Sequence, residues 1–105
     1  MIVVVGRVRT DDSKRADLIR IGATVASASR AEEGCIDYRV FEAVDAPNEF
    51  VFVEEWRDED ALQEHFTTSH IAQFMGAVTN AIIGAPDVKF HEVASSRDLS
   101  EVGAG

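Results

Sequence analysis

Basic residues are scarce in this chain of 105 residues. It has 10 lysines and arginines against 19 aspartates and glutamates, which gives a net charge of −9. Nucleic acids and anionic membranes are held by clustered positive charge, and the sequence contains no cluster of Lys or Arg. We therefore expect neither nucleic acid nor a membrane among the partners.

Cysteine and long apolar runs are scarce as well. Cys35 is the only cysteine, so no intrachain disulfide can form, and the composition fits a reducing compartment. No stretch approaches the roughly 20 apolar residues that span a bilayer. The short apolar N-terminus has no basic leader of the kind that begins a signal peptide. These absences predict a soluble, cytoplasmic protein.

The common cofactor motifs are also missing. The sequence has no phosphate-binding loop, no GxGxxG motif and no Ser-His-Asp arrangement. The spacing His65-x4-His70 has no third ligand in register and matches no recognised zinc or non-haem iron pattern. We expect no flavin, nicotinamide or metal cofactor.

The length fits one domain, expected over residues 1–94, with a polar C-terminal tail over residues 95–105. Apolar periodicity and turn residues predict four strands and two helical segments. The strands are expected at 2–9, 35–44, 49–57 and 87–93. The helical segments are expected at 13–33 and from residue 58 to a stop at 84–86, with a break at 67–69. This βαββαβ order is typical of an α+β, ferredoxin-like fold with a four-stranded antiparallel sheet and two helices on one face.

Local signals refine these boundaries. Asp12 and Asp58 are expected to cap the two helical segments, and Gly34 is expected to end the first one. In the second strand, Ile36 and Tyr38 are expected to share a face.

The third strand carries apolar residues on both faces. Glu54 and Trp56 share one face and Glu55 lies on the other, so the two glutamates cannot act as a pair. Because both faces are apolar, we expect helices on one side of the sheet and a second copy of the chain on the other, in a homodimer.

Three motifs occur in order along the chain: Glu32-Glu33-Gly34-Cys35 with Tyr38, Glu54-x-Trp56, and His65-x-x-Thr68-x-His70. Together they resemble the antibiotic-biosynthesis monooxygenase (ABM) superfamily, in particular its quinol monooxygenase branch, over about residues 2–93. The resemblance implies a dimeric α/β barrel. It also implies oxygenation of a quinol, an anthrone or a related aromatic compound by molecular oxygen without a cofactor. A haem-degrading activity is disfavoured, because Gly6 stands where that branch has Asn and the second helical segment lacks a Trp.

The same resemblance suggests a site. His65 or His70 is the expected base, because the ordinary histidine pKa of about 6.5 leaves a large neutral fraction near pH 7. Glu54 would orient an imidazole or act as the base itself. Five further side chains are candidates for contact with the substrate: Trp56, Tyr38, Arg39, Phe66 and Phe74.

Each of these residues also has a purely structural interpretation. The histidines can be helix-surface or capping residues, Trp56 a core or interface anchor, and Arg39 part of an edge salt bridge. Two other functions therefore stay open at this point. One is a cofactor-free isomerase of a small carbonyl or phosphocarbonyl metabolite, and the other is a non-catalytic dimeric protein that binds a small molecule.

Overall fold

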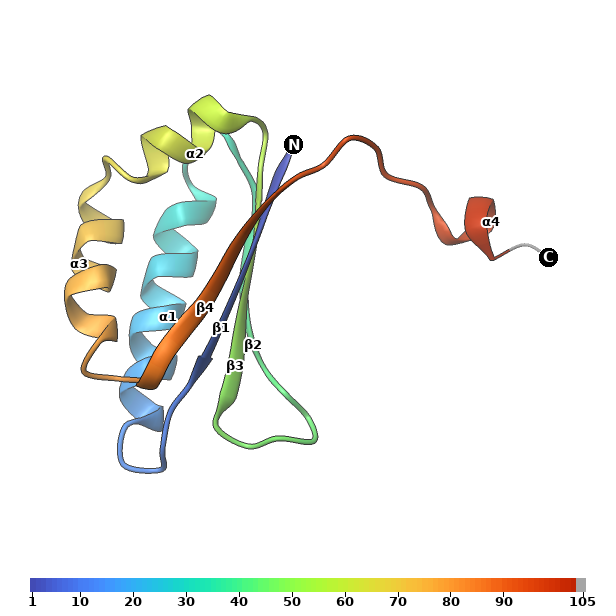
Figure 1. Cartoon of the computed structure of the whole chain (residues 1–105). Helices are drawn as coiled ribbons and strands as arrows, with labels where there is room; N and C mark the ends of the chain where they lie inside the picture. The colour runs from blue at the N-terminus through green and yellow to red at the C-terminus, as the bar shows by residue number, and fades with distance from the viewer. Residues whose placement is uncertain (104–105) are drawn as a thin grey trace.

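The computed structural model describes residues 1–103 and contains four strands and four helices (Figure 1). The strands are β1 (Ile2–Arg9), β2 (Cys35–Glu42), β3 (Glu49–Trp56) and β4 (Ile83–Glu92). The helices are α1 (Arg15–Arg30), α2 (Glu59–His65), α3 (Ser69–Val78) and the short α4 (Leu99–Val102).

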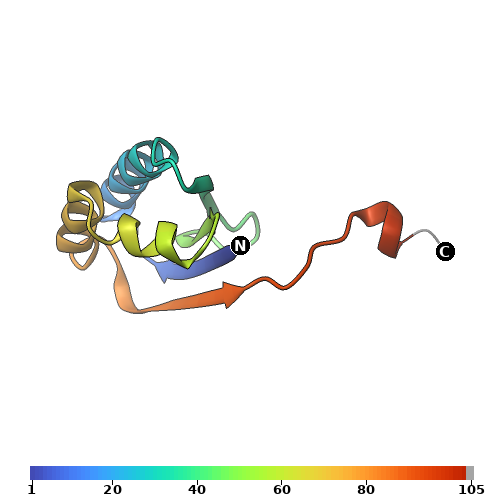
Figure 2. The ribbon, with the colours of Figure 1, turned by 90° about the horizontal axis from the view of Figure 1, so that it is seen from above.

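The strands form one antiparallel sheet in the order β2-β3-β1-β4. Helices α1, α2 and α3 lie on one face of this sheet, and Figure 2 shows the opposite face without a covering layer. The predicted ferredoxin-like α+β fold is confirmed. The predicted break in the second helical segment is confirmed too, because α2 and α3 are separate helices.

The core lies between the sheet and the helices. Alternation along β1 and β3 turns Val4, Phe52 and Trp56 toward the helices, where Leu18 and Val25 of α1 pack against the sheet. Each of these five side chains is at most 5% exposed. The sheet therefore has a buried inner face, and this is the face on which the site is built.

The boundaries of α1 differ from the prediction of 13–33. Lys14 occupies the N-cap position without a side-chain cap bond. Asp11, not Asp12, turns the chain into the helix: its Oδ1 accepts hydrogen bonds from the backbone N–H groups of Ser13 and Lys14, at 3.0 and 3.1 Å. At the other end the C-cap is Ala31, in a right-handed conformation.

Gly34 does not end α1, so that expectation is wrong. The glycine lies against α2, where an added Cβ would overlap the side chain of Ala61. Glycine is needed here because the loop that follows α1 lies very close to α2. This close approach places residues 31–34 beside α2, the helix that ends at His65.

The face expected for Ile36 is also wrong. Cys35 pairs with Trp56 and Asp37 pairs with Glu55, so one extra residue is inserted between them. Such a bulge turns the side chains on either side of it. Ile36 is consequently 56% exposed, whereas Tyr38 returns to the inner face and is 1% exposed.

Strand β4 begins four residues before the predicted start at 87, and α3 ends at Val78, well before the stop expected at 84–86. Gly84 has φ +70°, a conformation that favours glycine, and the pairing of β1 with β4 shifts register between Arg7 and Arg9. Pro86 is tolerated inside β4 because this strand lies at the edge of the sheet. The glycine and proline thus shape a strand instead of ending a helix.

Beyond β4 the chain leaves the domain and carries α4, as both views show (Figures 1 and 2). Residues 104–105, the last two of the tail expected at 95–105, lie outside the described residues. Within residues 1–103, no helix is long and apolar enough to cross a membrane.

Candidate active site

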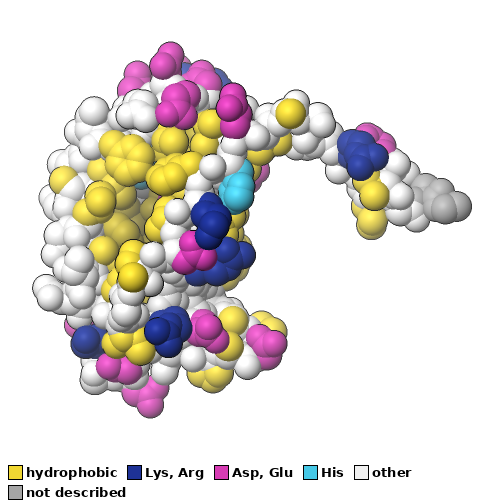
Figure 3. Space-filling view, viewed as in Figure 1, with side chains coloured by type: hydrophobic (Ala, Val, Ile, Leu, Met, Phe, Trp, Pro, Cys, Tyr) yellow, Lys and Arg dark blue, Asp and Glu magenta, His cyan; other side chains and the backbone are white. Residues whose placement is uncertain are grey.

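A cavity of about 310 Å³ lies between the inner face of the sheet and helices α2 and α3. Its walls are mainly apolar, and Figure 3 shows hydrophobic side chains gathered in a hollow on this side of the molecule. Phe66, Met75, Val88 and Phe90 line it while being 44–56% exposed, so they form its mouth. Among residues 1–103, three lining residues carry polar side chains: Tyr38, Glu54 and His65.

Glu54 reaches the cavity because β3 alternates. It pairs with Val4 of β1 on one side and Tyr38 of β2 on the other, while Glu55 points to the opposite face. The Trp56 indole donates a hydrogen bond to Glu54 Oε1 at 3.0 Å. Burial raises the pKa of Glu54 to about 7, against the opposing effect of hydrogen bonds from Trp56 and Tyr38. This carboxyl group is therefore close to half-ionised at neutral pH.

His65 is the last residue of α2 and is 1% exposed. Its Nδ1 lies 2.7 Å from Glu32 Oε2, and its ring lies 4.4 Å from the Trp56 ring, centroid to centroid. Burial lowers the pKa of His65, which favours the neutral ring. A carboxylate at Nδ1 holds the ring proton there and leaves the Nε2 lone pair available. The arrangement is that of a base oriented by a carboxylate.

The break after α2 determines where the second histidine lies. Thr68 donates a hydrogen bond to the His65 carbonyl at 2.7 Å and accepts one from the Ile71 N–H, which starts α3. The change of direction brings His70 Nε2 to 2.7 Å from the same Glu32 oxygen. Both imidazoles thus meet one carboxylate oxygen, from opposite sides of the helix break.

The structure brings five of the eight predicted site residues to the cavity: Tyr38, Glu54, His65, Phe66 and Phe74. The other three do not line it. Trp56 is fully buried behind Glu54 and His65, and His70 faces a groove of about 190 Å³ between α1 and α3. Arg39 forms a salt bridge with Asp37 at 3.0 Å on the edge strand, as its structural interpretation predicted.

Glu32 was missed as a site residue. The sequence shows it only as part of the Glu-Glu-Gly-Cys motif, because nothing in the local pattern of a helix end indicates contact with a residue 33 positions away. The neighbouring Cys35 is not a nucleophile candidate, since burial raises the pKa of its thiol to about 11.

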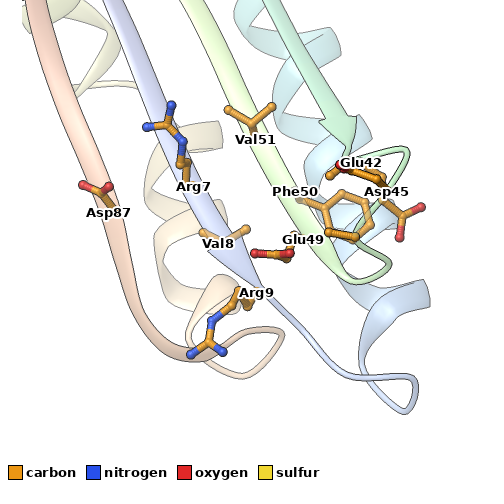
Figure 4. A pocket seen from close by; sticks show the side chains of 11 residues that line it. Arg7, Val8, Arg9, Glu42, Asp45, Glu49, Phe50, Val51 and Asp87 are labelled. Carbon is orange, nitrogen blue, oxygen red and sulfur yellow. The ribbon is translucent and has the colours of Figure 1, made fainter.

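A second depression, of about 680 Å³, lies at the end of the sheet near the β2-β3 loop (Figure 4). It is larger, but its charged residues are of both signs and at least one is already paired. Glu42 is bound to Arg15 at 2.6 Å, which holds the pKa of this carboxyl group at about 2. The cavity beneath α2 and α3 instead combines an apolar wall with Glu54, whose pKa is raised by burial to about 7.

The fold and the cavity define a small ferredoxin-like protein whose apolar cavity is lined by acid–base groups. Residues 1–77 match the family described as antibiotic biosynthesis monooxygenase, and the chain belongs to this family.

Three relatives illustrate the similarity. "Putative monooxygenase YcnE" of Bacillus subtilis is 35% identical over 86 residues, which cover 82% of this chain and 90% of that protein. The uncharacterized protein sll1783 of Synechocystis is 31% identical over 98 residues, 93% of this chain and 67% of that protein. A crystal structure from Deinococcus radiodurans, described as a "putative antibiotic biosynthesis monooxygenase", superimposes with a TM-score of 0.87 at 22% identity, covering 93% and 97% of the two chains. This last likeness supports the fold alone.

Proposed function

We propose that this protein is a cofactor-independent monooxygenase of quinols, anthrones or related electron-rich aromatic compounds. One observation carries the proposal: among residues 1–103, the polar side chains that line the apolar cavity are Tyr38, Glu54 and His65. The His65 ring is oriented by Glu32, and burial raises the pKa of Glu54 to about 7. A dry, aromatic-lined pocket with one oriented base is what this chemistry requires of a protein.

An anthrone illustrates the balance of the reaction. His65 Nε2 accepts a proton from the acidic CH₂ group, and the resulting carbanion donates an electron to O₂. Recombination of the radicals gives a peroxide, which takes up a proton and loses water to leave a C=O group. The CH₂ carbon supplies all four electrons that O₂ accepts, so no external reductant is needed.

The choice of His65 over His70 as the base follows from position. His65 lines the cavity, and Glu32 fixes its tautomer, whereas His70 faces the groove between α1 and α3. Glu54 is placed to accept a hydrogen bond from a second substrate hydroxyl, and Tyr38 to donate one to a phenolate.

The cavity also bears on the substrate class. Its volume lies at the lower end of the roughly 300–1,000 Å³ typical of small-molecule pockets, which suits a ligand of a few fused rings. In the part of the chain that the structure describes, no lysine or arginine lines it. A phosphorylated substrate would leave its charge without a partner there, so an isomerase of a phosphorylated metabolite is disfavoured.

The proposal includes a homodimer formed through the outer face of the sheet, as in a dimeric α/β barrel. The side chains on this face include valines that are only half-buried, Val3, Val5, Val51 and Val53, together with Phe41, which is 52% exposed. Burial of such a patch against a second copy would remove apolar surface from water.

Oxygen uptake by metal-free and flavin-free protein tests the proposal, with a panel of hydroquinones and anthrones. His65→Gln should lower turnover by about 10²–10⁴-fold, the usual contribution of a general base. Glu64→Gln is the control, because Glu64 is an exposed residue of α2 beside His65 that does not line the cavity. Absence of turnover on every substrate, or equal turnover by His65→Gln with its fold intact, would overturn the proposal. Turnover without oxygen would favour the isomerase.

A further inference from the structure

The cluster of Glu32, His65 and His70 holds three potential metal ligands from three separate segments. Glu32 lies in the loop after α1, His65 ends α2 and His70 lies in the first turn of α3. Their ligand atoms, one carboxylate oxygen, Nδ1 of His65 and Nε2 of His70, all lie within 4.8 Å of one another. The third ligand that the linear spacing lacks is thus supplied by the fold.

We propose that Glu32, His65 and His70 form a binding site for one divalent transition-metal ion of the zinc class. Two imidazoles and one carboxylate are the ligand set of His₂Glu zinc sites and of 2-His-1-carboxylate sites that leave a position open for water or ligand. The site goes beyond the proposed oxygenation, which uses the opposite nitrogen of His65 and needs no metal.

The charge of the cluster favours a cation. The Glu32 side chain is 15% exposed, and within residues 1–103 its ion-pair partners are the two histidines, with no lysine or arginine among them. A carboxylate that is largely removed from water is costly unless a positive charge compensates it. A divalent ion would supply that positive charge. Without an ion, the two imidazole rings supply it only when one of them is protonated.

The two Glu32–histidine distances need a small adjustment. Tetrahedral zinc with bonds of about 2.0–2.1 Å separates its ligand atoms by roughly 3.3 Å. Both Glu32–histidine distances are 2.7 Å, so the ligands must move apart by roughly half an ångström on each side of Glu32. Rotation of the Glu32 side chain can provide this movement, since the residue lies in a loop.

An ion could reach the site from the groove between α1 and α3. His70 lines this groove, and its side chain is 21% exposed. The side of the cluster nearer His70 is therefore the one open to solvent, while His65 closes the side toward the cavity. Metal and aromatic ligand would approach the two nitrogens of His65 from different directions.

Titration of untagged, chelator-treated protein with Zn²⁺ by calorimetry and with Co²⁺ by visible absorption tests the site. Wild type should bind one ion per chain, and Glu32→Gln and His70→Ala should each weaken binding by about 10-fold or more. These variants are preferred to changes at His65, whose burial makes misfolding a risk. Cys35→Ser and His91→Ala are controls for binding by the thiol and by the remaining histidine.

Zn²⁺ should also raise the melting temperature of wild type but not of Glu32→Gln, because the ion binds only the folded site. Absence of stoichiometric binding at about 0.1 mM Zn²⁺, a concentration that fills even a weak protein site, would overturn the proposal. Undiminished binding by both ligand variants would overturn it too. Loss of binding in Cys35→Ser or His91→Ala would overturn it as well. None of these readouts depends on substrate, so the metal site and the proposed function can fail separately.

Discussion

Replacement of Glu54 with glutamine should change how the stability of the protein depends on pH. Burial raises the pKa of Glu54 from its ordinary value of 4.5 to about 7. Between these two values the folded protein holds a proton that the unfolded chain has released. Stability should therefore fall as pH rises from about 4.5 to about 7 and level off above that range.

The magnitude follows from the size of the rise. Each pKa unit corresponds to about 1.4 kcal/mol, so a rise from 4.5 to about 7 corresponds to about 3.5 kcal/mol, and residual screening by solvent reduces it to about 2–3 kcal/mol. Glutamine keeps an acceptor for the Trp56 indole but does not ionise. Glu54→Gln should thus gain about 2–3 kcal/mol relative to wild type between pH 5 and pH 8.

Urea unfolding at fixed protein concentration, followed by Trp56 fluorescence at several pH values, measures this difference. Glu55→Gln is the matched control, because it removes the same charge from the opposite face of the same strand. The reasoning is refuted if the stability difference between wild type and Glu54→Gln stays constant, within about 0.5 kcal/mol, across this range. Comparison of free energies, not of fluorescence amplitudes, avoids the direct effect of the carboxylate on the indole.

Three further outcomes are expected. Gly34→Ala should destabilise the protein by about 1–3 kcal/mol in urea unfolding, because the new methyl group overlaps α2. Gly76→Ala, in an open position of α3, is the control and should be neutral or stabilising by up to about 1 kcal/mol. Phe41→Glu should convert a dimer into a monomer by light scattering, and Met75→Glu, which is similarly exposed at the cavity mouth, should not; an unchanged mass for Phe41→Glu would contradict the proposed interface. Saturating Zn²⁺ should suppress oxygen uptake and a chelator should restore it, because an ion on Nδ1 moves the His65 ring proton to Nε2; stimulation by Zn²⁺ would contradict this.

The sequence predicts the fold well because the fold depends on local periodicity. The alternation of β1 and β3 and the apolar stripe of α1 are strong signals, and the break at 67–69 is encoded by Thr68, whose side chain caps α3. Errors arise where tertiary contacts override local preference. Gly34 resembles a helix stop but serves a close approach to α2, and Gly84 resembles a terminator but shapes the start of an edge strand.

The site was predicted only in part, for a related reason. Strand alternation correctly separates Glu54 from Glu55, but it cannot show that Trp56 lies behind the cavity, since depth depends on the packing of α2. The break expected at 67–69 is present and separates the two histidines. Helix geometry cannot show that Glu32, more than 30 residues earlier in the chain, joins them, because that contact exists only after the loop and both helices have packed.

The most direct test of the proposed function is oxygen consumption by metal-free, flavin-free protein given an anthrone or hydroquinone that fits the cavity. The expected result is uptake of one O₂ per substrate, with a C=O product from the anthrone or a hydroxylated quinone from the hydroquinone, and one water released. The rate should fall about 10²-fold or more in His65→Gln and stay unchanged in Glu64→Gln. Oxygen uptake that needs an added cofactor, or that is the same in wild type and His65→Gln, would contradict the account.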